Sequence, residues 1–222
     1  MSIVTDLLRR AKRILQTEGL VPLVRQAAAF AVQRCFIYKV YYLDESSVEH
    51  FQNLSEADFM PKIASFTLKI VSTNEEADEL EAEGLEFRSL GFNARDALDK
   101  GAIALYVFVG KELANVSWIA MTEEAKLGLR ELPYRVDFSC NEACQVGMWT
   151  APKYRGMRFA RYASVEARRL LWEKGKVRMI SLIVKGNQAA HRSYAILGHK
   201  TYAEARYLKI LWWKFWKEKP LA

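Results

Sequence analysis

The sequence predicts an α+β fold in which a mixed β-sheet carries helices on both faces. The first observation is that a group of strand-like runs comes early, and strands then alternate with helices. The second is that short turn signals separate the early strands, whereas whole helices separate the later ones. We therefore expect an antiparallel front half and a β-α-β-α-β back half. The third is that 222 residues, 51% of them hydrophobic, can bury a sizeable core.

The N-terminal region is predicted to be a helical extension and linker at residues 1–60, preceding the main domain at residues 61–222. Ile3–Thr17 places apolar residues at steps of three and four, which is typical of an amphipathic helix. Pro22 is well placed in the first turn of a second helix that runs to about Cys35. These two helices are expected to pack on the main domain or on a second subunit, or to lie on a membrane surface.

Two segments connect this extension to the main domain. Phe36–Leu43 is aromatic and β-branched, which predicts a strand or an extended arm. Asp44–Pro61 is polar and acidic, and is expected to be an irregular linker.

The front half of the main domain is expected to be a group of antiparallel strands. Apolar runs and hairpin signals predict strands at Phe66–Val71, Ile103–Val109, Glu112–Met121, Tyr134–Phe138 and Ala143–Trp149. Capping residues precede a helix that reaches about Glu83, and a short helix follows at Asn93–Asp99. Glu123–Pro133 is expected to be a connection.

The back half alternates helices and strands. Its expected elements are a helix at Phe159–Trp172, a strand at Val177–Val184, a helix at Asn187–Leu197 that ends at Gly198, and an extended run at Lys200–Lys217. No turn signal interrupts the last run, which holds three of the six tryptophans. It is expected to be the last strand, and its Trp and Lys residues also suit a substrate pocket wall or a water–lipid boundary.

The net charge of +7 is concentrated at the two ends of the chain. Residues 1–43 carry +5 and residues 200–222 carry +4, which leaves −2 for the middle. This distribution argues against a nucleic-acid binder with a basic groove through its core. It is compatible with an anionic membrane surface as a peripheral partner for the two ends.

Cysteine usage leads us to expect a cytoplasmic protein, with possible peripheral contact at the membrane. The three cysteines form no disulfide framework, and no second Cys/His pair joins Cys140 and Cys144 at a metal-ligand spacing. We therefore expect no metal. The sequence also shows neither a secretory signal nor a spanning helix.

The segment Thr150–Ala160 (TAPKYRGMRFA), which we call the anion loop, is expected to be the centre of the function. It combines a strand end, a basic turn that contains a glycine, and the first turn of a helix. The N–H groups of that turn have no partner within the helix, and aligned peptide dipoles add partial positive charge. Arg155 and Arg158 add two full charges. The loop is therefore predicted to bind a phosphate or a pyrophosphate.

Two stretches resemble the GNAT superfamily of acyl-CoA-dependent N-acyltransferases. Arg155–Ala160 resembles the family's pyrophosphate loop, Q/R-x-x-G-x-G/A, with Arg158 in place of the central glycine. The later helix fits the family's pattern N-x-x-A-x-x-x-Y-x-x-x-G-F through Asn187, Ala190, Tyr194 and Gly198. His199 stands where the pattern has phenylalanine. The resemblance covers about residue 65 to the C-terminus and leaves residues 1–60 outside.

The resemblance implies a GNAT fold that uses acetyl-CoA or another acyl-CoA as co-substrate and a primary amine as acceptor. The implied pyrophosphate-binding residues are Arg155, Gly156, Met157, Arg158, Phe159 and Ala160. The implied contacts of the pantetheine arm and the thioester are Met148, Trp149, Thr150 and Asn187. Tyr194 is implied to protonate the departing thiolate, since a phenol can serve as general acid.

Several points stay open at this level. Glu142 is the candidate nearest in sequence for the general base that takes a proton from the ammonium group, and Asp137 and Glu131 are weaker candidates. Two other functions fit the same residues: a non-catalytic acyl-CoA-binding or regulatory module, and a membrane-surface transferase of acyl or aminoacyl groups. An edge-forming C-terminal strand is compatible with a homodimer. No motif identifies the acceptor amine.

Overall fold

The computed structural model describes residues 36–85, 94–129 and 132–221. The helices expected before residue 36 lie outside these residues, as does Glu131. The chain divides into two units, of which the larger contains Tyr41–Glu204 and the smaller contains Ala205–Glu218. Each unit is described separately below.

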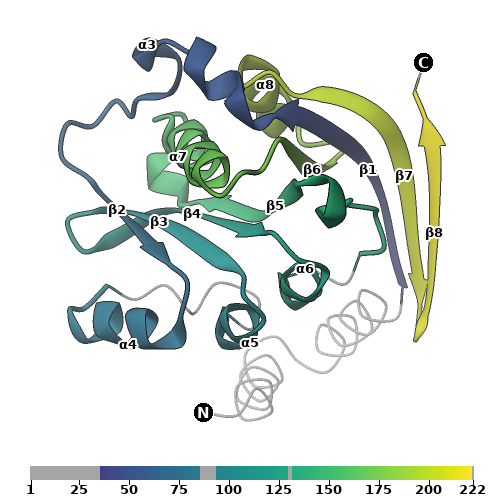
Figure 1. Ribbon diagram of the computed structural model, residues 1–222, viewed down its shortest axis with the longest axis horizontal. Helices are drawn as coiled ribbons and strands as arrows, with labels where there is room; N and C mark the ends of the chain where they lie inside the picture. Colours follow the sequence, from purple (N-terminus) through teal and green to yellow (C-terminus); the bar gives the residue numbers. More distant parts are fainter. Residues whose placement is uncertain (1–35, 86–93, 130–131, 222) are drawn as a thin grey trace, which may run out of the picture. The chain divides into compact units, whose positions relative to one another are not determined.

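Eight strands form one mixed sheet in the order β2-β3-β4-β5-β6-β1-β7-β8 (Figure 1). The strands are β1 (Phe36–Ser47), β2 (Thr67–Val71), β3 (Ile103–Val109), β4 (Glu112–Ala120), β5 (Glu142–Thr150), β6 (Arg178–Val184), β7 (Lys200–Ile210) and β8 (Trp213–Pro220). Strands β2 to β5 are antiparallel neighbours, and β5 and β6 are parallel. The expected antiparallel front half is therefore present.

Helices lie on both faces of the sheet in the larger unit. The α-helices are α3 (Glu56–Phe59), α4 (Asn74–Ala82), α5 (Ala94–Asp99), α6 (Glu123–Leu129), α7 (Phe159–Glu173) and α8 (Gln188–Ile196). The short 3-10 helices are η1 (Val48–Asn53), η2 (Phe138–Cys140) and η3 (Pro152–Tyr154). Figure 1 shows α7 on one side of the sheet and α4, α5 and α6 on the other.

The core of the larger unit lies between the sheet and α7. It contains Val48, Ile103, Leu105, Ile119, Ala143, Ala167, Leu171 and Met179. A second cluster joins Tyr154, Phe159 and Ala163 to β3 and β4. Small residues, Ala163 and Ala167, alternate with the large Phe159 and Leu171 on the face of α7 that packs against the sheet. This packing fixes the N-terminus of α7 at one end of β5.

The first strand occupies a place that the sequence did not predict. Strand β1 pairs with β6 in antiparallel register from Tyr41↔Val184 to Ser47↔Arg178. The segment that was expected to be a linker continues β1 to Ser47 and then forms η1 and α3. Residues Asp44–Ser47 of the expected linker therefore belong to the sheet. Two polar residues of β1, Asp44 and Ser46, are buried, which conceals the strand pattern in the sequence.

Three other local expectations differ from the structure. The expected connection after β4 contains α6. The expected strand at Tyr134–Phe138 is absent, because Asp137 caps the short helix η2 and Asn141 follows it with a φ of 58°. The expected last strand is two strands, with a turn at Leu211 and Trp212. Leu211 adopts a φ of 55° there, a conformation that glycine or asparagine usually signals.

The described helices are short. None of those in residues 36–85, 94–129 and 132–221 has the length and apolar character that crossing a membrane would require.

Candidate functional site

A cleft opens where β5 and β6 separate. The two strands pair only from Glu142↔Arg178 to Gln145↔Ser181. Beyond this point they diverge and enclose a volume of about 620 Å³. The cleft is lined by β5 from residue 145 onward, by the anion loop, by the end of β6 and by α8.

A β-bulge in β5 accompanies this separation. Val146 pairs with Trp118 and Trp149 pairs with Val116, so two residues of β5 oppose one residue of β4. Gly147 lies in the bulge with a φ of 66°, which a glycine adopts without strain. Because a bulge bends its strand, it turns the end of β5 away from β6. Backbone groups of Met148–Thr150 thus border the cleft without a strand partner on the β6 side.

Buried aromatic residues hold the anion loop in place. The rings of Tyr154 and Phe159 are both buried and pack edge to face with centroids 5.8 Å apart. The Tyr154 hydroxyl donates to Glu112 Oε2 at 2.5 Å, and Lys153 Nζ donates to the same oxygen at 2.7 Å. These contacts attach the loop to the start of β4.

Arginine side chains and a helix N-terminus meet at this end of the cleft. Arg155, Arg158 and Arg161 all line it. Arg155 Nε donates to the Thr150 carbonyl at 3.4 Å, and Arg161 Nη1 donates to the Asp58 carbonyl at 2.8 Å. Arg158 is the N-cap of α7, and its side chain makes no capping hydrogen bond. The positive end of α7 and three guanidinium groups together give this end of the cleft the chemistry that an anion requires.

Arg158 takes a backbone conformation that usually belongs to glycine. Its φ is 69°, the left-handed region, at the position where the family pattern has glycine. Strained residues of this kind persist only where the surrounding structure holds them in place, and they cluster at functional sites. The side chain of Arg158 lines the cleft, so we expect it to contact a bound phosphate.

Replacing Arg158 with glycine is expected to stabilise the fold and weaken binding. Glycine relieves the backbone strain at this position, but it also gives the unfolded chain more conformational entropy. The net effect should raise the free energy of unfolding by about 0.5–1 kcal/mol. Loss of one charge-assisted contact should weaken acyl-CoA binding about tenfold. Arg158→Ala is the matched control, because it removes the charge but keeps the strain. Calorimetry and denaturant unfolding measure the two effects, and unchanged affinity in both variants would place Arg158 outside the phosphate site.

At the other side of the cleft lies the buried hydroxyl of Tyr194 on α8. It donates to Gln145 Oε1 at 3.3 Å, and Ser164 Oγ donates to the same oxygen at 3.0 Å. Gln145 Nε2 in turn donates to Ser117 Oγ at 2.7 Å. Burial raises the pKa of Tyr194 to about 12, although the positive charge of Arg168 opposes the shift. Tyr194 therefore keeps its proton at neutral pH and can donate it.

Arg168 extends this polar cluster beneath the cleft. Its side chain is fully buried. Arg168 Nη1 donates to Ser164 Oγ at 2.9 Å, and Nη2 donates to Ser46 Oγ at 3.1 Å. Nη2 also lies 2.5 Å from His199 Nε2, whose ring packs against Tyr194 with centroids 4.2 Å apart. In the described part of the chain no carboxylate forms an ion pair with Arg168, so its charge acts on the polar cluster around Tyr194.

His199 makes the stability of the fold depend on pH. Burial lowers its pKa from 6.5 to about 2, and the charge of Arg168 adds to the effect. The folded state therefore binds fewer protons than the unfolded chain below pH 6.5, so stability present above this pH is lost as the pH falls. The loss should reach up to about 1.4 kcal/mol per pH unit. Urea unfolding between neutral and mildly acidic pH should show that the free energy of unfolding falls less steeply with pH in His199→Gln than in the parent protein. Equal pH dependence in the two proteins would contradict this assignment.

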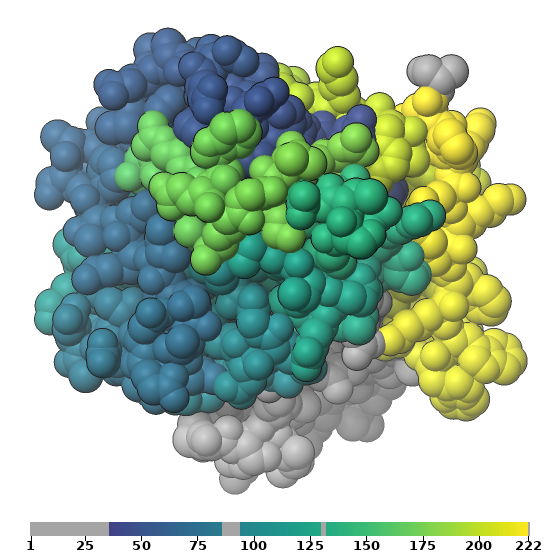
Figure 2. All heavy atoms as spheres, viewed as in Figure 1, coloured from purple at the N-terminus to yellow at the C-terminus, as the bar shows by residue number. Residues whose placement is uncertain are grey.

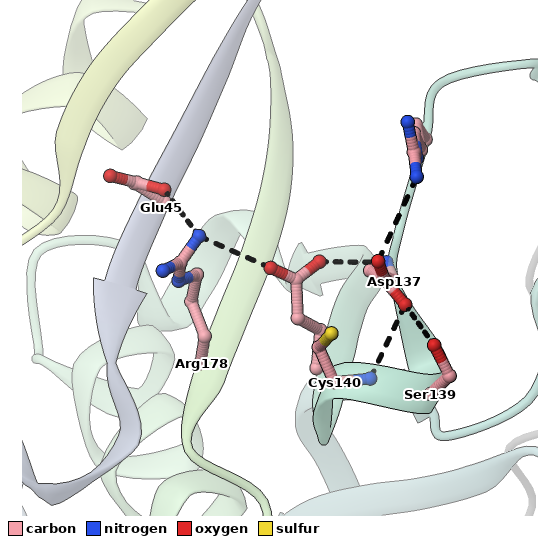
Figure 3. Close-up of polar contacts among 7 residues, drawn as sticks. Glu45, Asp137, Ser139, Cys140 and Arg178 are labelled. Carbon is pink, nitrogen blue, oxygen red and sulfur yellow. Dashed lines mark hydrogen bonds and ion pairs between the residues drawn. The ribbon is translucent and has the colours of Figure 1, made fainter.

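The structure does not bring Glu142 to the cleft. Glu142 Oε1 lies 3.2 Å from Arg178 Nη1, and Oε2 accepts from the Asp137 N–H at 2.7 Å. Figure 3 shows the surrounding contacts, in which Glu45 also faces Arg178 and Asp137 holds Ser139 and the Cys140 N–H. This cluster lies at the start of β5, whereas the cleft begins at Gln145. Both candidate bases, Glu142 and Asp137, are therefore outside the cleft lining.

Most of the other expected site residues lie together. Those that line the cleft are Met148, Trp149, Thr150, Arg155, Gly156, Arg158, Phe159, Ala160, Asn187 and Tyr194. Met157 is the exception, since it packs against the cluster beneath the loop. Asn187 caps α8 by accepting the Ala190 N–H at 3.2 Å, which leaves its amide at the edge of the cleft. Within the described residues no three His, Cys, Asp or Glu side chains gather as a metal site.

Sequence reasoning missed the buried polar residues that support the site. Gln145 and Asn115 are polar positions in otherwise apolar strands, and Asn115 Nδ2 donates to the Trp149 carbonyl at 2.8 Å. Ser164 and Arg168 lie one helical turn apart on the buried face of α7. A polar residue at an expected core position is the signal that could have found each of them.

Comparison with known proteins identifies the fold. No protein-family model matches the chain, and no curated protein matches its sequence. A GCN5-related N-acetyltransferase-like protein from Streptococcus suis 89/1591 is structurally similar, with a TM-score of 0.50 and 12% identity over 91% of this chain and 69% of that one. The chain therefore has the fold of the GNAT superfamily, and the prediction of an α+β mixed sheet with this fold is confirmed.

Two further solved structures are similar at lower scores. An acetyltransferase of the GNAT family from Colwellia psychrerythraea has a TM-score of 0.48 and 12% identity over 84% of this chain and 61% of that one. A GCN5-related N-acetyltransferase from Kribbella flavida has a TM-score of 0.45 and 16% identity over 82% of this chain and 63% of that one. The chain thus spans about six tenths of the length of these two proteins.

Proposed function

We propose that this protein transfers an acetyl or other short acyl group from acyl-CoA to a primary amine, by direct attack of the amine on the thioester. One observation carries the proposal: a single cleft joins the cationic N-terminus of α7 to the buried hydroxyl of Tyr194. Acetyltransferases with the same fold support acyl transfer in general.

The lining of the cleft suits an anionic ligand. It contains three arginines and the first turn of α7, and no Asp or Glu side chain is among the described residues that border it. Its volume of about 620 Å³ falls within the usual range for cofactor sites. We expect the N–H groups of Arg155–Ala160 to bind the pyrophosphate of coenzyme A, because unpaired N–H groups at a helix N-terminus favour phosphate.

The end of β5 is suited to hold the acyl group. When bound, acyl-CoA supplies a thioester that is already activated for transfer. Backbone groups of Met148–Thr150 have no strand partner on the β6 side and can bind the pantetheine arm. A backbone N–H aimed at the thioester oxygen stabilises the charge that develops there, an effect worth about 2.7–4 kcal/mol in comparable enzymes.

Tyr194 is the proposed general acid. The amine nitrogen attacks the carbonyl carbon, the carbon–sulfur bond breaks, and the Tyr194 hydroxyl gives its proton to the departing sulfur. The resulting phenolate is buried, and the positive charge of Arg168 stabilises it. Since no described carboxylate or histidine lines the cleft, we propose that the amine loses two protons to water, one before the attack and one after it, and that water returns a proton to the Tyr194 phenolate.

The test combines thiol release with binding. The protein is incubated with acetyl-CoA and a panel of amines, and free thiol is followed with a chromogenic disulfide. The proposal expects thiol release that requires both substrates. Calorimetric binding of coenzyme A without turnover on any amine would instead favour an acyl-CoA-binding module. The absence of any coenzyme A binding would contradict both functions.

Other expectations from the sequence remain proposals. They are the cytoplasmic location, the homodimer and the contact of the basic ends with an anionic membrane. We assign no particular primary amine as the acceptor.

A further inference from the structure

The hairpin of β7 and β8 exposes a cluster of apolar side chains around its turn. Trp212 and Trp213 are 73% and 61% exposed. The exposed set, which we call the aromatic tip, is Ile210, Leu211, Trp212, Trp213 and Phe215. Figures 1 and 2 show the hairpin in yellow, and Figure 2 shows its atoms at the surface of the molecule. An exposed apolar cluster of this kind marks an interaction surface.

The alternation of the strands places most of the tip on one face of the hairpin. The rings of Tyr207 on β7 and Trp216 on β8 have centroids 6.4 Å apart, so these two residues share a face. Side chains alternate along a strand. Ile210, Trp213 and Phe215 therefore share the opposite face, and Leu211 and Trp212 form the turn between the two strands.

Cationic residues follow the tip along both strands. Ala205–Glu218 contains Arg206, Lys209, Lys214 and Lys217, against the single acid Glu218. By the same alternation Lys209 and Lys214 lie on the face of Tyr207 and Trp216, whereas Arg206 and Lys217 lie on the face of Ile210, Trp213 and Phe215. At roughly 3.3 Å per residue, Lys209 and Lys214 lie about 7 Å from the turn along the strands, so cations flank the tip on both faces of the hairpin. A long lysine side chain reaches further still.

This order of residues matches the chemistry of a lipid surface. Tryptophan favours the boundary between headgroups and acyl chains, and lysine favours the phosphates just above it. A second copy of the same hairpin is a poorer partner, because a symmetric contact would bring like charges together.

We propose that the aromatic tip docks this protein on an anionic lipid surface, with Trp212 and Trp213 at the headgroup boundary and Lys209 and Lys214 on lipid phosphates. The proposal does not depend on the function assigned to the cleft. Residues that carry it all belong to Ala205–Glu218, which the cleft does not include.

The test is co-sedimentation of the full chain with sucrose-loaded vesicles of phosphatidylcholine, with and without phosphatidylserine. Binding is expected only with phosphatidylserine. Trp212→Ser/Trp213→Ser should weaken it at least about tenfold, as interfacial aromatic side chains are lost. Lys209→Gln/Lys214→Gln should weaken it about fivefold for each charge removed.

Matched variants control for general loss of aromatic or cationic surface. Trp172→Ser removes an exposed tryptophan of α7, and Lys174→Gln/Lys176→Gln removes two cations near the end of that helix. Both should bind vesicles like the parent protein. Circular dichroism checks that every variant is folded, which is expected because the substituted side chains are on the surface.

A fluorescence measurement tests how deeply the aromatic tip enters the lipid bilayer. Vesicles with brominated acyl chains should quench tryptophan emission of the parent protein. Trp212→Phe/Trp213→Phe should still sediment with vesicles but lose most of this quenching.

Three results would overturn the proposal. The first is no binding to any vesicle, and the second is undiminished binding of the Trp212→Ser/Trp213→Ser variant. The third is a self-association of the parent protein, measured by light scattering, that the Trp212→Ser/Trp213→Ser variant abolishes while its binding to vesicles stays unchanged. Thiol release measured without vesicles reports on the cleft alone, so failure of either proposal can be recognised separately.

Discussion

Replacing Tyr194 with phenylalanine is expected to lower kcat for acyl transfer about 10²–10⁴-fold, the usual contribution of a positioned general acid. The substitution removes one oxygen and keeps the ring that packs against His199. The anion loop lies on the other side of the cleft, so the dissociation constant of acyl-CoA should stay close to that of the parent protein. A loss of kcat without a loss of affinity is the signature of an interaction made only in the transition state.

The matched control for this prediction is Tyr162→Phe. Tyr162 lies on α7, its ring packs on Phe66, and it is not part of the cleft lining. We expect the control to retain parental kcat. Steady-state rates of thiol release, together with calorimetry of acyl-CoA binding, measure both variants. Parental turnover in Tyr194→Phe would exclude the acid role.

Replacing Gly198 with alanine is expected to destabilise the fold by about 2–4 kcal/mol, from backbone strain and overpacking combined. Gly198 ends α8 with a φ of 75°. A Cβ atom at this position would lie 2.4 Å from the ring of His50, which belongs to η1. Since real Cβ contacts are never so short, either the ring or the helix end must move.

Two variants separate the causes of this loss. Gly175→Ala also has a positive φ, 69°, but no atom lies within 4 Å of its added Cβ. It should cost only the backbone strain, about 1–2 kcal/mol. His50→Ala combined with Gly198→Ala should recover much of the difference. Urea unfolding measures all of them, and equal losses for the two single glycine variants would show that His50 is not the obstacle.

The sequence allowed strands β2 to β6 and helices α4, α5, α7 and α8 to be predicted in their order, together with the position of the anion loop between β5 and α7, but it missed α6 and predicted a strand at Tyr134–Phe138 that is absent. The correct predictions depend on local signals: apolar runs, glycine turns and the cationic start of α7. It did not allow the position of β1 to be predicted. Asp44 and Ser46 are polar residues that are typical of a linker, yet both are buried. Asp44 Oδ1 accepts a hydrogen bond from Thr201 Oγ1 at 2.7 Å, and Ser46 Oγ accepts one from Arg168. Partners this distant in sequence leave no local pattern.

The distance between partners in the sequence also explains which residues of the cleft the sequence indicated and which it did not. Arg155, Arg158 and Tyr194 belong to motifs of fixed spacing, whereas Gln145, Ser164 and Arg168 meet only through the packing of α7 on the sheet. Glu142 is close to the loop in sequence, which makes it the nearest candidate base by sequence alone. A strand, however, separates positions at about 3.3 Å per residue, which places Glu142 at the end of β5 away from the cleft.

The most direct test of the account is a calorimetric titration of the full chain with coenzyme A and, separately, with pantetheine, which lacks the pyrophosphate and the nucleotide. If the cleft binds acyl-CoA through the anion loop, coenzyme A should bind at least about a hundredfold more tightly, because charge-assisted hydrogen bonds to phosphate are the strongest contacts available there. Equal affinity for the two ligands, or no binding of coenzyme A, would contradict the account.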